Sequence, residues 1–170
     1  MGIEGNKENK GVIVAGMNSS DGKTLVTCLL LSALERRNIL VQPFKIGPDY
    51  IDPGYHSRVS KRNSLNLDPW IMGKKLVIEE AKKFTENAFG IAEGVMGLFD
   101  GANPSNDQGS TMEIARWLKW PVLLVVDASH AGRSIVASIR GFLDEAGPGM
   151  IEGLILNRLG SEGHGSYLQK

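Results

Sequence analysis

The tripeptide Gly22-Lys23-Thr24 has the residue types of a phosphate-binding loop. An apolar, β-branched run at 12–15 precedes it, and an apolar helical pattern follows it directly. Between a strand and a helix, the backbone N–H groups of such a loop and the positive end of the helix point at one anion. We therefore expect the Lys23 ammonium to reach the β- and γ-phosphates of a nucleotide, and the Thr24 hydroxyl to hold Mg²⁺.

This loop is a variant of the strict phosphate-binding pattern. The strict pattern has a glycine five residues before Gly22, whereas the available glycine stands one position earlier, at Gly16. The longer spacing favours a variant P-loop ATPase over a Ras-like GTPase. An ordinary turn with a helix cap is the alternative interpretation. The predicted nucleotide-binding residues of the loop are Gly16, Asn18, Ser19, Asp21, Gly22, Lys23 and Thr24.

Charged residues also follow the second predicted strand, where Lys45, Asp49 and Asp52 lie close together in the sequence. Ligands of open α/β sheets bind beyond the carboxyl ends of the strands, so these side chains should share one edge with the phosphate loop. A carboxylate such as Asp49 suits Mg²⁺, and Lys45 can neutralise a phosphate or a substrate carboxylate. A loop of solvated charges is the alternative.

Three later strand ends carry further candidates. Glu93 stands late in an apolar run, where an unpaired carboxylate is costly, and a Mg²⁺ ion near Thr24 would supply its partner. A capping acid is the alternative for Glu93. Asp127 ends the fourth predicted strand, either in a Walker-B-like role or as a loop cap. Asn157 and Arg158 end the fifth, either to contact a nucleotide base or as a turn with an exposed arginine.

Apolar β-branched runs alternate with helical patterns along the chain, which is typical of a parallel α/β sheet. The sequence predicts strands at 12–15, 40–44, 91–95, 122–127 and 154–156, and helices at 23–37, 74–87, 111–119 and 133–145. We therefore expect a P-loop NTPase-like three-layer fold, with a mostly parallel central sheet flanked by helices. The segment 47–73 is rich in Gly, Pro, Asp, Asn and Ser, and we predict it to be a functional loop.

Composition limits the classes of function. The 170 residues are 42% hydrophobic, and 19 basic residues balance 19 acidic ones, so nothing indicates a nucleic-acid partner. There is neither a signal peptide nor an apolar run of about 20 residues, so we expect a cytoplasmic protein without a membrane partner. The three histidines lie in loop-like sequence without the spacing of metal ligands. We expect a flexible leader at 1–10 and one domain at 11–170.

Together, these segments resemble the amino-terminal synthetase domain of the cobyrinic acid a,c-diamide synthase family. The most specific matches are Gly-Pro-Asp-Tyr-Ile-Asp-Pro at 47–53 and Asn-Leu-Asp-Pro-Trp at 66–70. The wider relatives are dethiobiotin synthetase-like and MinD-like P-loop ATPases. The other matching segments are 16–24, 41–46, 93–101, 125–133 and 156–158, so the resemblance spans almost the whole chain after residue 10.

The resemblance implies an ATP- and Mg²⁺-dependent amide ligase of cobalamin biosynthesis. Members of the family phosphorylate the a and c side-chain carboxylates of a corrin precursor, and ammonia then displaces the phosphate. Asp52 and Asp100 would position the substrate or the ammonia, and Asn157 would contact adenine. By position, the resemblance implies Lys23, Asp52, Glu93 and Asp100 as catalytic residues, Thr24, Asp49 and Glu93 as metal ligands, and Lys45, Asn157 and Arg158 as further nucleotide-binding residues.

Two departures from the family accompany this resemblance. The phosphate loop has Ser20 where the family usually has glycine. The family also carries a carboxyl-terminal glutaminase domain, which this sequence does not contain. We therefore expect a chain truncated before that domain, with ammonia supplied by a glutaminase domain or subunit outside it, and we include a homo-oligomer among the expected assemblies.

Three alternative functions stay open at this point. A nickel-sirohydrochlorin a,c-diamide synthase would have the same residue pattern. A dethiobiotin synthetase-like ligase would lack the Asp-Tyr-Ile-Asp run at 49–52. A MinD/ParA-like ATPase switch would carry a second lysine early in the phosphate loop, and 16–21 contains none.

Overall fold

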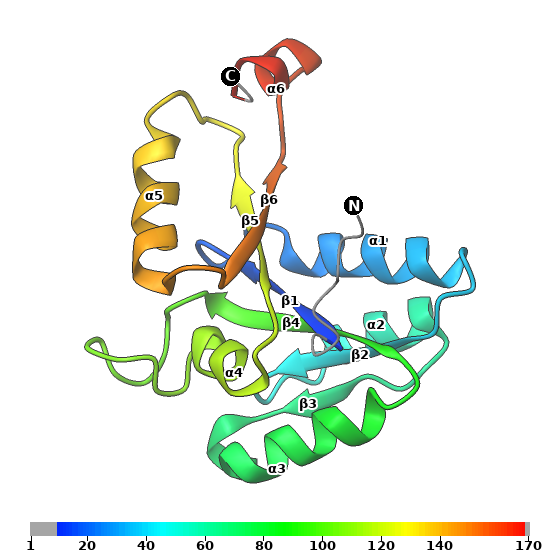
Figure 1. Cartoon of the computed structure of the whole chain (residues 1–170). Coiled ribbons are helices and arrows are strands. Elements are labelled where there is room, and N and C mark those ends of the chain that lie inside the picture. The colour runs from blue at the N-terminus through cyan, green and yellow to red at the C-terminus, as the bar shows by residue number, and fades with distance from the viewer. Residues whose placement is uncertain (1–9, 169–170) are drawn as a thin grey trace, which may run out of the picture.

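Six parallel strands form the central sheet of the computed structural model, which describes residues 10–168 (Figure 1). Their spatial order is β3-β2-β4-β1-β5-β6. Residues 1–9 of the expected leader lie outside the described residues. The strands are β1 (Gly11–Gly16), β2 (Val41–Ile46), β3 (Leu65–Leu67), β4 (Phe89–Gly97), β5 (Val122–Asp127) and β6 (Ile151–Asn157).

Helices cover both faces of this sheet and give the expected three layers (Figure 1). Those on one face, α1 and α2, pack on a smaller apolar cluster, and those on the other, α3, α4 and α5, pack on a larger one. No helix in the described part of the chain is long and apolar enough to cross a membrane. The helices are α1 (Lys23–Glu35), α2 (Asp52–Ser60), α3 (Pro69–Phe84), α4 (Thr111–Leu118), α5 (Ile135–Ala146) and α6 (Glu162–Leu168).

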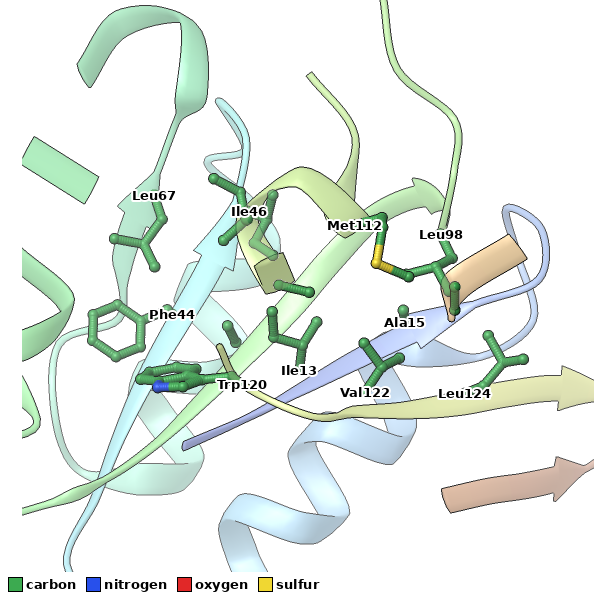
Figure 2. Close-up of a cluster of buried hydrophobic side chains, with 14 of the residues drawn as sticks. Ile13, Ala15, Phe44, Ile46, Leu67, Leu98, Met112, Trp120, Val122 and Leu124 are labelled. Atoms are coloured by element: carbon green, nitrogen blue, oxygen red, sulfur yellow. The ribbon is translucent and has the colours of Figure 1, made fainter. Parts of the chain in front are cut away.

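The two apolar clusters follow from the alternation of side chains along each strand. In β1, Val12 and Val14 belong to the smaller cluster, and Ile13 and Ala15 to the larger one. Trp120 lies in the larger cluster, where its ring centroid is 6.0 Å from that of Phe44 (Figure 2). The indole packs directly on the sheet, because β1 and β4 have glycines, Gly11 and Gly90, where a Cβ atom would collide with the ring.

Each of the five predicted strands is present, with bounds that differ by up to three residues at either end. The prediction of a loop at 47–73 was wrong: this segment contains α2, β3 and the start of α3. The Pro53-Gly54 pair suggested a loop, but proline is tolerated in the first turn of a helix, and Pro53 lies there. The short β3 pairs with β2 and extends the sheet at that edge. This part of the segment is therefore regular secondary structure rather than a loop.

Candidate functional site

The phosphate loop connects β1 to α1 at the carboxyl edge of the sheet. The Asn18 N–H donates to Asp21 Oδ2 at 2.8 Å, and Lys23 Nζ donates to the Asn18 carbonyl oxygen at 3.0 Å. Burial lowers the pKa of Lys23, although the charge of Asp21 opposes that shift. These contacts hold the loop in a turn with the lysine folded back over it, as a phosphate-binding loop requires.

Two residues of this loop have left-handed backbone conformations. Gly22 has a φ of 98°, and a Cβ atom there would also collide with the side-chain amide of Asn157. Ser20 has a φ of 66°, a conformation that favours glycine. The departure from the family at Ser20 therefore falls on a position where the backbone itself prefers glycine.

A set of ionisable side chains lies beside the loop; we call Lys45, Asp52, His56 and Glu93 the Glu93 cluster, in which all but Asp52 are buried. Lys45 Nζ lies 2.7 Å from Asp52 Oδ2 and 3.0 Å from Glu93 Oε1. His56 Nε2 lies 2.6 Å from Glu93 Oε2. The Thr24 hydroxyl donates to Glu93 Oε1 at 2.7 Å, which connects the cluster to the phosphate loop.

Two members of the Glu93 cluster, Glu93 and Lys45, are held in their ionised forms. Burial alone would raise the pKa of Glu93, but the hydrogen bond from His56 and the charge of Lys45 lower it below its usual value. Burial alone would lower the pKa of Lys45, and the charge of Glu93 together with the hydrogen bond to Asp52 raises it. The carboxylate and the ammonium therefore each stabilise the charge of the other.

The turn before α2 positions the two aspartates. Asp49 Oδ1 accepts hydrogen bonds from the backbone N–H groups of Ile51 at 2.8 Å and Asp52 at 3.1 Å. Although burial raises the pKa of Asp49, these hydrogen bonds hold it below its usual value. The other oxygen of Asp49 lies 3.7 Å from Lys45 Nζ. Asp49 thus keeps one oxygen directed toward the cluster.

A bulge in β4 shapes the other wall of the site. Val14 pairs with Glu93, but Gly16 pairs with Gly97, so β4 contains extra residues between those two points. The buried Thr111 hydroxyl accepts from the Val95 N–H at 3.1 Å and donates to the Val95 carbonyl oxygen at 3.2 Å. The side chain of Thr111 therefore supplies the partners that the bulge removes from the strand ladder.

These elements enclose a cavity of about 500 Å³ that contains most of the predicted site. The loop supplies the Lys23 ammonium to this space, and the Glu93 cluster supplies carboxylates. Of the predicted site residues, the cavity is lined by Ser19, Gly22, Lys23, Thr24, Lys45, Asp49, Asp52, Glu93 and Arg158. Asn18 and Asp21 line a second cavity behind the loop, and the structure places Gly16, Asp100 and Asn157 outside both linings.

Asp100 and Asn157 are engaged with the backbone of the site. Asp100 Oδ2 accepts from the Gly97 N–H at 2.8 Å, at the end of the bulge. The Asn157 amide donates to the Asp21 carbonyl oxygen at 2.8 Å, and its oxygen accepts from the Arg158 N–H at 2.9 Å. Both side chains thus hold loops that shape the site, while the proposed contacts with ammonia and adenine stay predictions.

The donors present fit Mg²⁺. The Thr24 hydroxyl and the Glu93 carboxylate offer hard oxygen atoms within 2.7 Å of each other, and Asp49 lies nearby. Within residues 10–168, no three His, Cys, Asp or Glu side chains form a metal-binding group by themselves. That arrangement suits Mg²⁺, which is bound through one or two carboxylates together with water and substrate phosphates.

His56 is the functional candidate that the sequence analysis missed. We predicted loop-like surroundings for all three histidines, which was wrong for His164, in α6, and for His56, which lies within α2 and is fully buried. The available signal was its spacing from Asp52: residues four apart share one helix face. That signal depends on recognising α2 as a helix.

Comparisons with known proteins agree with this geometry. The family described as the CobQ/CobB/MinD/ParA nucleotide binding domain matches residues 12–170. Cobyrinate a,c-diamide synthases of Syntrophotalea carbinolica and Picrophilus torridus are 46% and 45% identical over 94% and 93% of this chain. A hydrogenobyrinate a,c-diamide synthase of Brucella ovis is 45% identical over 94% of it. The chain spans 35% to 37% of the length of these curated relatives.

Proposed function

The chain belongs to the CobQ/CobB/MinD/ParA nucleotide binding domain family, and from that membership we propose that it amidates the a and c carboxylates of a cobyrinate-type macrocycle with ATP and Mg²⁺. One observation carries the proposal: Lys23, Thr24, Glu93 and Lys45 line a single cavity, and Thr24 Oγ1 contacts Glu93 Oε1 at 2.7 Å. This arrangement supports the proposal, because the residues proposed to bind the nucleotide lie beside carboxylates that suit a metal ion.

The reaction has two balanced steps. An oxygen of the substrate carboxylate attacks the γ-phosphorus of ATP, the bond to the leaving ADP breaks, and an acyl phosphate forms. Ammonia then attacks the acyl carbon, the C–O bond to phosphate breaks, and the nitrogen loses a proton as the amide forms. The first step is needed because a free carboxylate is a poor electrophile with a poor leaving group.

The residues of the cavity divide this work. Lys23 stabilises the negative charge that the γ-phosphoryl group carries during transfer. Mg²⁺ bound at Thr24 and Glu93, with Asp49 nearby, would neutralise further phosphate charge. Lys45, held by Glu93 and Asp52, fixes the wall that faces the substrate carboxylate. Asp52 lines the cavity, and in our proposal it helps to position the substrate or the ammonia.

The ammonia comes from outside this domain in our proposal. Its relatives are about three times as long as the matching segment, so a glutaminase domain or subunit is the proposed source. Free ammonium at high concentration replaces that source in an assay. Ammonium-dependent amidation by this chain is therefore the reaction to measure.

The test is phosphate release from Mg-ATP with ammonium chloride, with and without cobyrinic acid, together with mass spectrometry of the macrocycle. We expect release that depends on the macrocycle, and a product with two carboxylates converted to amides. Parallel reactions contain hydrogenobyrinic acid and nickel-sirohydrochlorin, and they identify the preferred macrocycle. Phosphate release at the same rate with and without each macrocycle would favour an ATPase switch instead.

A matched variant connects that activity to the phosphate loop. Lys23→Ala should reduce phosphate release by at least about a hundredfold, because it removes a preorganised cation from the transferring group. Lys10→Ala is the control, since Lys10 is an exposed lysine before β1 and lines no part of the cavity. Full turnover by Lys23→Ala would contradict the assignment of the loop.

A further inference from the structure

The mechanism proposed above gives no role to His56, although this side chain is fully buried and contacts Glu93. Its Nε2 atom lies 2.6 Å from Glu93 Oε2. The ionised carboxylate only accepts hydrogen bonds, so Nε2 carries the hydrogen and donates it. Nδ1 then faces Ser64 Oγ, which lies 3.5 Å away.

The two oxygens of Glu93 have separate sets of partners. Oε1 faces the cavity side, where it accepts from the Thr24 hydroxyl at 2.7 Å and from Lys45 Nζ at 3.0 Å. Oε2 contacts only His56 among the hydrogen bonds of the described residues. A partial rotation about the terminal bond of Glu93 would turn Oε1 away from Thr24, and the His56 contact with Oε2 opposes that rotation.

The helix α2 makes His56 a rigid support. Asp52 and His56 are four residues apart, so one face of α2 delivers an oxygen to Lys45 and a nitrogen to Glu93. The Ser60 hydroxyl donates to the His56 carbonyl oxygen at 2.8 Å, farther along the same helix. The backbone that carries the imidazole is therefore held by its own helix, and the ring itself is buried between Glu93 and Ser64.

We propose that His56 is a positioning residue that holds Glu93 Oε2 and thereby keeps Oε1 directed at Thr24, where the metal of the nucleotide is bound. This inference rests on the proposed function, because that function assigns Mg²⁺ to Thr24 and Glu93. A residue that orients a metal-binding carboxylate from behind changes metal affinity without touching the substrate.

The test measures metal dependence rather than turnover. Binding of a fluorescent ATP analogue to the full chain is titrated with Mg²⁺, and the Mg²⁺ concentration for half-maximal binding is compared among variants. His56→Leu removes the donor at similar volume and should raise that concentration at least about tenfold. His56→Gln can place an amide N–H where Nε2 lies, and it should remain within about threefold of the natural chain.

Two further variants separate positioning from packing. His164→Leu is the matched control: His164 Nε2 lies 2.7 Å from the Ala131 carbonyl oxygen, outside the cluster, so its loss should leave the Mg²⁺ titration unchanged. If His56→Leu does not fold by circular dichroism, His56→Asn replaces it. The Asn side chain is too short to reach Glu93, so its half-maximal concentration should exceed that of His56→Gln.

Defined outcomes overturn the inference. An unchanged Mg²⁺ titration in folded His56→Leu, or equal titrations for His56→Gln and His56→Asn, excludes a positioning role. Nucleotide binding by the natural chain that ignores Mg²⁺ overturns it as well. Failure of the amidation assay with an intact Mg²⁺ response would contradict only the proposed reaction, because the titration involves no macrocycle.

Discussion

Two ion pairs lie on opposite sides of the phosphate loop, and they differ in exposure. Lys45, near the end of β2, and Glu93, in β4 just before its bulge, have side chains that are 4% and 1% exposed. Arg158 and Asp127, at the ends of β6 and β5, are 50% and 28% exposed. Each pair joins a cation to a carboxylate at direct contact distance, so burial is the main difference between them.

That difference determines what each pair can contribute. In a buried pair, the loss of one partner leaves an uncompensated charge away from water, which is strongly destabilising. In an exposed pair, solvent screens the charges and either residue can be lost at little cost. The sheet therefore has a rigid, buried cluster on one side of the loop and a replaceable contact on the other.

Removing the cation from each pair should give the largest contrast. Lys45→Met leaves Glu93 and Asp52 without their shared partner, and we expect about 3–5 kcal/mol lower free energy of unfolding. Arg158→Met should lower it by less than about 1 kcal/mol. Urea denaturation of both variants measures the two values. Similar values for the two variants would mean that burial does not distinguish the pairs.

Neutralising the carboxylates should separate their effects on metal dependence. Glu93→Gln removes the charge that faces Thr24, so the Mg²⁺ concentration for half-maximal nucleotide binding should rise about 10- to 100-fold while the fold is retained. Asp127→Asn should change it less than about twofold, because Asp127 does not line the main cavity. A large effect of Asp127→Asn would restore the Walker-B-like alternative.

The loop between the two pairs provides a smaller test. Ser20 has a φ of 66°, and a non-glycine residue there costs about 1–2 kcal/mol. Ser20→Gly relieves that strain but adds freedom to the unfolded chain, so we expect a net gain of about 0.5–1 kcal/mol in free energy of unfolding. Ser19→Gly, at a position without positive φ, should give no gain. A loss of stability in Ser20→Gly would show that the serine side chain holds the loop.

Much of this comparison was accessible from the sequence. Five of the six strands, the phosphate loop and the shared location of Lys45, Asp49, Asp52 and Glu93 follow from apolar runs and from the rule that parallel strands end at one edge; β3 does not. Strong periodicity and a glycine-lysine-threonine motif make local predictions dependable, because each rests on neighbouring residues only.

The partners of these residues could not be predicted in the same way. The contact between His56 and Glu93 joins residues 37 apart in the sequence and depends on α2. That helix was not predicted, because Pro53 and Gly54 suggested a loop. The bulge in β4 depends on Thr111, 16 residues beyond Val95. Such contacts are fixed by packing of one element on another, and the sequence pattern of either element alone does not contain them.

The exposed pair should respond to acid and salt, although the effect is the smallest of these. The N–H of Ser129 and the side chain of Arg158 lower the pKa of Asp127 to about 2. An aspartate in the unfolded chain has a pKa of about 3.9. The ionised Asp127 therefore stabilises the folded state above about pH 4, and this contribution to stability is lost as the pH falls toward about 2. Carboxyl ¹³C chemical shifts should report this titration directly.

Arg158→Met, or salt at about 1 M, should raise the pKa of Asp127 toward its usual value, because solvent ions screen an exposed pair. The same salt concentration should leave the pKa of Glu93 unchanged, since its partners are buried with it. If the pKa of Asp127 does not respond to salt, this pair is shielded from solvent ions in the same way as the buried pair. The contrast between the two sides of the loop would then come from geometry rather than from exposure.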